Sequence, residues 1–404
     1  MEKFYLPLMD NNIDKKDIKA LVDFLSQEQI PRLTNGPKVV EFEKAWGKWL
    51  GTKYNLMVNS GASANELTML ALKYLYGDGE IIIPPLTWIS DVASVIFSGL
   101  KPVFCDINLK NFSFDLEKLK ETITPNTKAI FLTHVLGING LTDELLDLCE
   151  KNNILLIEDV CESHGTTHNG QLVGSFGDVS NFSFFYAHHI TTIEGGMVCT
   201  NNEEIYQHSR IFRSHGMLRE CTNESIKNKY HEDYPTVNKD FFFVNPAYNM
   251  RSTEINAVLG LNQIHRLNGD IKKRRDNFNY FISHLDKQKY YTDFVLEGNS
   301  NYAFVVIFNQ RDYDIAEDYG LIVEQQDKRD ALEQLLRDNK IEFRRGLSGG
   351  GNQLRQPYIQ NNYNFDLNEF PVVEHIHHFS WYIGNYPSLE RHKIDKLLDL
   401  LNNL

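Results

Sequence analysis

The sequence predicts an α/β fold with a mixed, mostly parallel sheet wrapped by helices and a smaller C-terminal α/β domain. Two observations lead to this prediction. Short apolar runs alternate with longer amphipathic segments along much of the chain, which is typical of strands alternating with helices. The 404 residues also exceed what one simple core usually holds, so a second domain is expected.

The expected elements follow in chain order. Apolar residues at helical spacing mark the two segments 13–25 and 41–50. The chain then alternates strand-like runs at 80–85, 101–107, 128–135, 154–160 and 195–200 with helix-like runs such as 115–123 and 142–153. A long helix over 252–285 is expected to connect a large domain, residues 1–265, to a small domain, residues 266–404. In the small domain, the runs that suggest an α/β layer are 302–308, 331–341 and 388–404.

The charge and hydropathy exclude several classes of function. The formal net charge is −13, and a nucleic-acid surface needs a basic stripe instead. The short basic run 271–276 is better interpreted as the solvated face of a helix. No apolar run approaches the ~20 residues that span a bilayer. The N-terminal residues lack the apolar core of a secretory signal, so we expect a cytoplasmic protein.

The cysteines favour reduced thiols in a cytoplasmic protein over disulfides or a zinc site. The five cysteines are dispersed and form no C-x-x-C pair. None follows Cys221, so the C-terminal half has no thiolates for an iron–sulfur cluster. No metal site is expected.

Small residues mark a candidate phosphate site at 59–65, "NSGASAN". A strand is expected to end there and a helix to begin. The free N–H groups of a helix start bind phosphate well when no bulky Cβ stands in the way. An ordinary turn is the alternative interpretation. The hydroxyl of Ser183 can likewise meet a phosphate or bond to the local backbone.

Two acidic residues and one aromatic residue follow strand-like runs. Asp159 ends an apolar run, where a carboxylate needs a cationic partner, and a protonated pyridine nitrogen would be one. A helix N-cap is the alternative. Glu162 either reaches a hydroxyl on the same ring or belongs to a capping box. Trp88 follows the run 80–85 and either stacks on a planar ring or packs in the core.

Taken together and in order, these motifs resemble the sugar-nucleotide aminotransferases of the fold-type I pyridoxal phosphate superfamily. The order is S-G-x-x-A after a strand, an aromatic after "PP", E-D-x-x-x-x-x-G, then S-F-x-x-x-x-x-x-T-x-x-E-G-G, and "YNMR" at 248–251. The resemblance runs from about Leu6 to the C-terminus. It implies a pyridoxal or pyridoxamine phosphate cofactor and the architecture of that superfamily.

The sequence departs from the family at the residue that matters most. The family has a cofactor-binding lysine six positions before the glutamate of E-G-G, and counting back from Glu194 gives His188. No lysine occurs between Lys151 and Lys227. An imidazole forms no stable Schiff base but works as a general base near neutrality. The neighbouring His189 is expected to be structural.

This substitution is typical of the 3-dehydratase branch of the family. The resemblance implies that glutamate provides the amino group and that the C3 hydroxyl of a nucleotide-linked 4-keto-6-deoxy sugar is removed, with His188 as the catalytic base. Ammonia and 2-oxoglutarate would be released with a 4-keto-3,6-dideoxy sugar. Because no cysteine follows Cys221, the glutamate-driven, GDP-sugar type is preferred to the CDP-sugar type with an iron–sulfur cluster. The destination would be lipopolysaccharide or capsule.

The resemblance also assigns binding residues. The cofactor would be held by Gly61, Ala62, Trp88, Asp159, Glu162, Ser183 and, from a partner subunit, Asn249. A homodimer with shared active sites is therefore implied. The sugar nucleotide and glutamate would be bound by Pro31, Arg32, Leu33, Thr34, His215, Arg219, Arg251 and Arg344. The Gly-rich segment 344–358 suggests a flexible cover over the nucleotide.

Two other interpretations stay open. The chain is either an aminotransferase whose lysine has been lost or replaced, leaving it inactive or trapped, or a non-catalytic regulatory relative. The retained cofactor residues favour the dehydratase over both.

Overall fold

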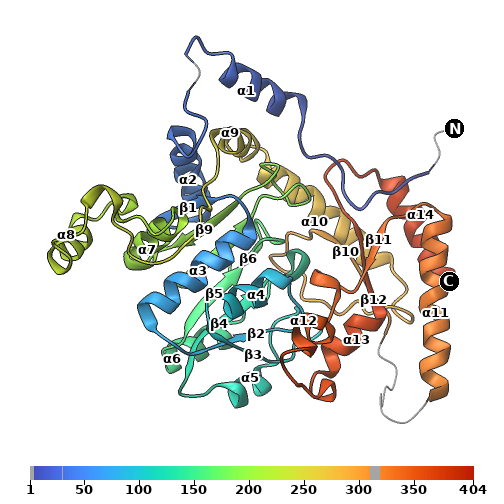
Figure 1. Ribbon diagram of the computed structural model, residues 1–404. Coiled ribbons are helices and arrows are strands. Elements are labelled where there is room, and N and C mark those ends of the chain that lie inside the picture. Colours follow the sequence, from blue (N-terminus) through green and yellow to red (C-terminus); the bar gives the residue numbers. More distant parts are fainter. Residues whose placement is uncertain (1–3, 30, 310–318) are drawn as a thin grey trace.

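Seven strands form the central sheet of the computed structural model, which describes residues 4–29, 31–309 and 319–404 (Figure 1). In spatial order the strands are β1 (Tyr54–Val58), β9 (Gly196–Thr200), β8 (Val179–Ser183), β5 (Leu155–Asp159), β4 (Thr127–Thr133), β2 (Glu80–Ile83) and β3 (Lys101–Phe104). Neighbouring strands from β8 to β3 run parallel, and β9 runs antiparallel to both of its neighbours. The sheet is mixed and mostly parallel, which confirms the expected fold class.

A smaller antiparallel sheet follows in the C-terminal part of the chain. Its strand order is β10 (Ala303–Ile307), β12 (Ser380–Gly384) and β11 (Phe343–Arg345). A short hairpin pairs β6 (Thr167–His168) with β7 (Gln171–Leu172). The sequence indicated β10 but neither β11 nor β12. The small sheet agrees with the expected C-terminal layer, and the domain boundary at residue 265 stays a prediction.

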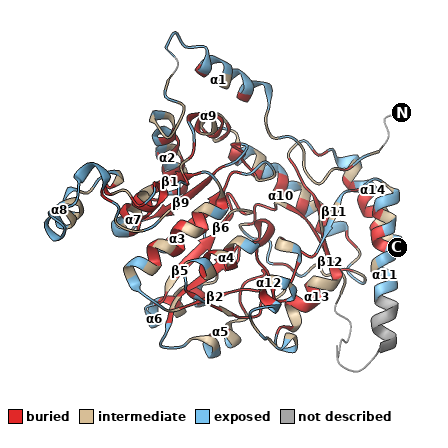
Figure 2. Ribbon diagram, in the orientation of Figure 1, coloured by how far each residue is buried: buried red, intermediate tan, exposed pale blue. Residues whose placement is uncertain are grey.

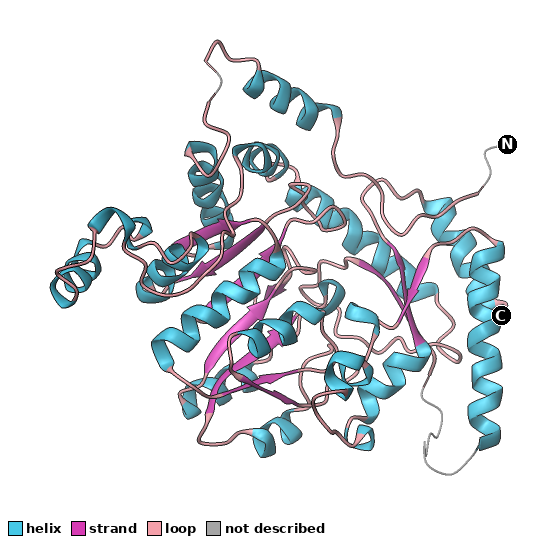
Figure 3. Ribbon diagram, viewed as in Figure 1, coloured by secondary structure: helices cyan, strands magenta, loops and turns pink. Residues whose placement is uncertain are grey.

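Helices cover both sheets, as the cyan ribbons of Figure 3 show. In the N-terminal and middle parts they are α1 (Lys15–Leu25), α2 (Pro37–Leu50), α3 (Gly61–Tyr76), α4 (Ile89–Phe97), α5 (Leu116–Thr122), α6 (Asp143–Asn152), α7 (Glu203–Arg213) and α8 (Glu224–Asp233). The remaining ones are α9 (Glu254–Gln263), α10 (Leu267–His284), α11 (Tyr319–Asp338), α12 (Pro357–Gln360), α13 (Pro371–Phe379) and α14 (Arg391–Asn402). No helix within the described ranges is long and apolar enough to span a membrane.

The prediction of one long helix over 252–285 is wrong in one respect, because two helices occupy this segment. The chain leaves the helix after Gln263 and α10 begins at Leu267. At the break, the Arg266 guanidinium pairs with Asp17 at 2.6 Å and also donates to the Asn12 carbonyl oxygen at 2.6 Å. Apolar residues continue at helical spacing across the break, so the sequence pattern hides it.

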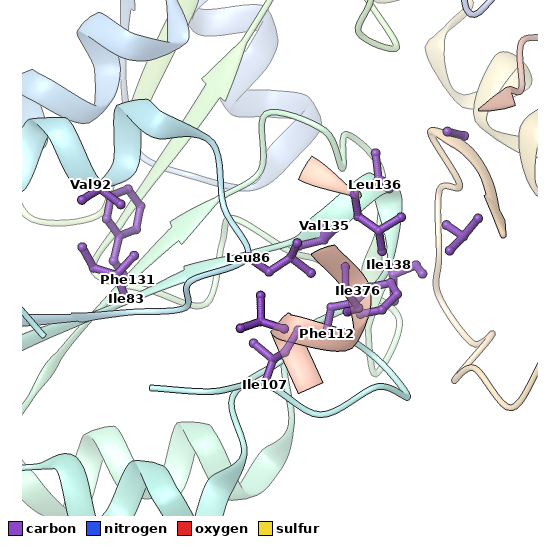
Figure 4. Packing of buried hydrophobic residues seen from close by; sticks show 14 of the residues in the cluster. Ile83, Leu86, Val92, Ile107, Phe112, Phe131, Val135, Leu136, Ile138 and Ile376 are labelled. Atoms are coloured by element: carbon purple, nitrogen blue, oxygen red, sulfur yellow. The ribbon is translucent and has the colours of Figure 1, made fainter. Parts of the chain in front are cut away.

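The strands of the central sheet are buried on both faces, while the outer faces of the helices are exposed (Figure 2). Burial on both faces suits the continuous apolar runs of a mostly parallel sheet. One apolar cluster joins the central sheet to the C-terminal part. In Figure 4 Ile376 of α13 lies beside Leu86, Phe112 and Val135, with Phe131 of β4 further along the same cluster. This shared packing places the small sheet against the carboxyl ends of the large one.

His164 packs against aromatic residues of a second apolar cluster, which includes residues of β8 and β9. Its ring is fully buried, with centroids 5.5 Å from Trp46, 5.7 Å from Phe182 and 5.8 Å from Phe184. Burial lowers the pKa of His164 well below its usual value, and nearby His188 adds to the effect. The folded protein therefore holds this imidazole neutral.

We predict that His164→Leu makes stability less sensitive to acid. The pKa of His164 is lower in the folded state than the usual ~6.5, so below about pH 6.5 the unfolded chain binds the extra proton and stability falls. Between pH 7 and pH 5 one such histidine costs about 2 kcal/mol. Urea unfolding at both values and one protein concentration should show the variant losing about that much less than the wild type. Equal losses would contradict the prediction.

Candidate active site

A cavity of about 810 Å³ lies at the carboxyl ends of the parallel strands. Its wall includes Thr133, Asp159 and Ser183, the last residues of β4, β5 and β8, together with the start of α3. Arg344 of β11 and Tyr382 of β12 line it from the small sheet. Ligands of open α/β sheets bind at this edge.

The structure brings half of the expected site residues together. The cavity is lined by Gly61, Ala62, Trp88, Asp159, Glu162, Ser183, His188 and Arg344. The residues of the same chain that do not line it are Pro31, Arg32, Leu33, Thr34, His215, Arg219, Asn249 and Arg251.

The start of α3 and Ser183 form a narrow cradle. Ser60 caps the helix by accepting a hydrogen bond from the Ser63 amide, and the N–H groups of the first turn follow it. A Cβ on Gly61 would lie 2.6 Å from the Ser183 Cβ, so only glycine allows this approach. Exposed N–H groups at a helix start beside a hydroxyl fit a phosphate.

Asp159 places a buried carboxyl group on the wall of the cavity. Its carboxylate accepts hydrogen bonds from the Cys161 amide at 2.7 Å and from the Asn65 amide group at 3.3 Å. No Lys, Arg or His within the described residues forms an ion pair with it. Neighbouring Asp91 is fully buried, and burial together with Asp159 raises its pKa well above the usual value. A buried carboxyl group that lines the cavity and lacks an ion-pair partner suits a cationic ligand atom.

Trp88 and Glu162 provide a flat surface and a polar contact. Trp88 stands at the start of α4 with 55% of its surface exposed, so its indole is available to a ring in the cavity. Glu162 accepts a hydrogen bond from the Leu136 amide at 3.0 Å and one from the Ser348 hydroxyl at 3.2 Å. Burial raises the pKa of Glu162 to about 7. Ser348 is itself buried, so this part of the Gly-rich segment is packed rather than a flexible cover.

His188 lines the cavity, and its neighbour His189 does not. His189 is buried, with Nε2 3.4 Å from the Ser300 carbonyl oxygen, as expected for a structural residue. Burial and the guanidinium of Arg274 lower the pKa of His188 to about 3. Its Nδ1 is buried and forms no hydrogen bond within the described part of the chain. The imidazole is therefore neutral before any proton transfer.

Among the residues that the structure describes, no lysine lines the cavity. The carboxyl, thiol and imidazole groups on its wall belong to His134, Asp159, Cys161, Glu162, His188, Glu194 and Glu342. A cofactor in this cavity would therefore meet no lysine amine from residues 4–29, 31–309 or 319–404.

One wall of the cavity was not predicted from the sequence. Tyr5, Pro7, Leu8 and Met9 line it from the N-terminal segment. Glu342 holds this segment by accepting from the Tyr5 hydroxyl at 2.6 Å and from the Leu8 amide at 2.9 Å. These contacts join residues more than 330 positions apart, and no local motif marks them.

The expected site residues that do not line the cavity lie elsewhere in the structure. Asn249 bridges to Ser214, Arg251 to Val58, and Thr34 to Thr253. His215, with a φ of 63°, lines a separate hollow of about 550 Å³ formed with residues 243–248. Asn249, Arg219 and Arg32 are exposed.

Comparison with known proteins agrees with the fold and with the motifs. The family model described as the DegT/DnrJ/EryC1/StrS aminotransferase family matches residues 11–402. The GDP-4-keto-6-deoxy-D-mannose 3-dehydratase of Escherichia coli O55:H7 is 31% identical over 401 residues, covering 98% of this chain and 99% of the relative. The GDP-perosamine synthase of Caulobacter vibrioides is 36% identical over 239 residues, covering 59% of each chain.

A solved structure extends this similarity to the fold. The E. coli GDP-4-keto-6-deoxy-D-mannose-3-dehydratase with bound hydrated PLP has a TM-score of 0.82 and 29% identity, and the match covers 99% of this chain and 100% of that one. The resemblance expected from the sequence motifs is thereby confirmed. The chain therefore belongs to the DegT/DnrJ/EryC1/StrS aminotransferase family, whose members include pyridoxal phosphate-dependent sugar aminotransferases and dehydratases.

Proposed function

We propose that this chain is a pyridoxal/pyridoxamine phosphate-dependent 3-dehydratase. It removes the C3 hydroxyl of a GDP-linked 4-keto-6-deoxy sugar and yields a 4-keto-3,6-dideoxy sugar. Glutamate donates the amino group that is released as ammonia, and 2-oxoglutarate leaves as the second product. The C3 oxygen leaves the sugar as water, and the keto oxygen of 2-oxoglutarate comes from water by hydrolysis, so the overall reaction balances. The cytoplasmic location stays a prediction.

The observation that carries this proposal is His188 in a cavity whose described wall residues include no lysine. The other expected groups at the cavity are in place: the α3 cradle, the buried Asp159 and the open face of Trp88. The relative named as a GDP-4-keto-6-deoxy-D-mannose 3-dehydratase, 31% identical over nearly the whole chain, adds support.

The residues fit the cofactor that the family uses. The N–H groups of Gly61 and Ala62, with the Ser183 hydroxyl, would bind the phosphate. Asp159 would hold the protonated ring nitrogen, Trp88 would stack on the ring, and Glu162 would contact the ring hydroxyl. When bound in its amine form, the cofactor supplies an amino group for the C4 ketone and a conjugated ring that accepts electrons.

His188 would move the proton. Its neutral imidazole lines the cavity and would accept the proton at a ring nitrogen. An amine at this position would instead compete for the cofactor. Arg344, on β11, would bind a carboxylate or phosphate group of glutamate or the sugar nucleotide.

An aminotransferase that has lost its lysine is the second candidate. The relative named GDP-perosamine synthase, 36% identical over 239 residues, is the observation that favours it. The two candidates differ in the product, because a transaminase leaves a 4-amino sugar with its C3 oxygen retained.

Product analysis tests the proposal. The protein is incubated with pyridoxal phosphate, glutamate and a GDP-4-keto-6-deoxy sugar, beside a His188→Asn variant. The wild type should release ammonia and 2-oxoglutarate and produce a sugar without the C3 oxygen. His188→Asn should bind the cofactor normally but eliminate about 10²–10⁴-fold more slowly, because asparagine accepts no proton. The visible absorbance of the bound cofactor checks binding.

Two outcomes would overturn the proposal. The first is a 4-amino sugar, or no turnover with any nucleotide sugar. The second is elimination by His188→Asn at the wild-type rate, which would exclude His188 as the base.

We also propose that the site is completed by a second copy of the chain. Asn249, His215 and residues 31–34 lie outside the cavity of their own chain, which suits groups that reach a partner's cavity. Phe241, Phe243 and Tyr248 beside them are exposed, and such apolar patches are typical of interfaces.

Mixing inactive variants tests this arrangement. A heterodimer of His188→Asn with Asn249→Asp retains one intact site, because one subunit has the base and the other has the phosphate contact. Random exchange should then restore about a quarter of the wild-type activity. Mixing His188→Asn with Asp159→Asn should restore nothing, since both residues come from one chain. No recovery with the first pair would contradict shared sites.

A further inference from the structure

The loop that carries His188 has a strained turn. It spans 184–195, between β8 and β9, and is closed by a hydrogen bond from the Phe184 amide to the Gly195 carbonyl oxygen at 2.8 Å. Within it Ile193 has a φ of 72°. A β-branched side chain rarely adopts this left-handed conformation, which persists only where surrounding contacts fix it.

Asn256 of α9 holds the two carbonyl groups on either side of that strained residue. Its Nδ2 donates to the Thr192 carbonyl oxygen at 2.6 Å and to the Glu194 carbonyl oxygen at 3.0 Å. The hydroxyl of Thr253 donates to Asn256 Oδ1. This contact orients the side-chain amide, because it places the oxygen toward Thr253 and the donor toward the loop.

Asn12, from the N-terminal segment, holds the loop at His188 itself. Its Nδ2 donates to the His188 carbonyl oxygen at 2.7 Å. The position of Asn12 is fixed by Arg266, which donates to its carbonyl oxygen at 2.6 Å and pairs with the fully buried carboxylate of Asp17. Arg266, at the break between α9 and α10, therefore supports the hydrogen bond from Asn12 to His188.

Both asparagines act on backbone carbonyl groups and neither lines the cavity. They come from segments nearly 250 positions apart, and they donate hydrogen bonds to the loop at two places, at His188 and around Ile193. Gln263, the last residue of α9, adds a third point by accepting from the Thr191 amide at 2.9 Å.

We propose that Asn12 and Asn256 are positioning residues, which hold the 184–195 loop in the strained form that presents the His188 imidazole to the cavity. The proposal rests on the proposed function only for the role of His188 as base. A base that is free to move loses rate rather than substrate affinity, since misplacement of about 1 Å costs roughly 10²-fold.

Isosteric variants test it. Asn256→Asp and Asn12→Asp keep the shape of the side chain but replace the donating amide with an oxygen that repels the carbonyl groups. Asn152→Asp is the matched control, because Asn152 donates to the Leu148 carbonyl oxygen at 2.8 Å on the exposed surface of α6. Each is compared with the wild type by hydrogen exchange of peptides covering 184–195 and by steady-state kinetics.

We expect both test variants to exchange the amides of this loop at least tenfold faster than the control, with an unchanged melting temperature. Their kcat should fall about 10- to 100-fold with KM and cofactor binding unchanged. If the loop amides of the test variants exchange at the wild-type rate, the proposal is overturned. Faster exchange with an unchanged kcat would also overturn it. If the wild type eliminates no C3 hydroxyl, the proposed function fails and exchange alone decides whether the asparagines hold the loop.

Discussion

Under the proposed function, the cavity at the sheet edge holds a phosphate-bearing ring without a lysine linkage, because none of its described wall residues is a lysine. Non-covalent contacts are individually weak, so several must act together. The fold provides them at one place, because parallel strands end at the same edge of the sheet. The start of α3, Ser183 at the end of β8, Asp159 at the end of β5 and Trp88 before α4 all meet there. Such a site retains its ring only while this set is complete.

Burial and one nearby guanidinium set the protonation state of the two adjacent histidines. Arg274 is fully buried and donates to the carbonyl oxygens of Tyr302 and Asn385, with no ion pair to a carboxylate among the described residues. Its charge, added to burial, keeps the imidazoles of His188 and His189 neutral. A neutral imidazole accepts a proton, whereas a protonated one does not. This environment keeps the His188 imidazole in the form that can accept a proton, and it also lowers the affinity of the imidazole for that proton.

The parts predicted from the sequence are those marked by local patterns. The order of strands and helices, the Gly61 cradle, Asp159, Trp88 and the register that places His188 at the lysine position all belong to short motifs. The parts missed depend on contacts between distant residues. Asp91 has an ordinary helical context in the sequence, and the wall formed by Tyr5–Met9 depends on Glu342. The break before Leu267 depends on the pairing of Arg266 with Asp17, which periodicity does not show.

The central claim is that the cofactor is held at His188 without a covalent bond, and borohydride reduction tests it directly. The complex with pyridoxal phosphate is reduced, unfolded, and measured by intact mass and peptide mapping. Because reduction makes a lysine linkage permanent, a lysine enzyme would gain one cofactor per chain. Without such a linkage, the protein is expected to return to its unmodified mass. One cofactor per chain on a single lysine would contradict it.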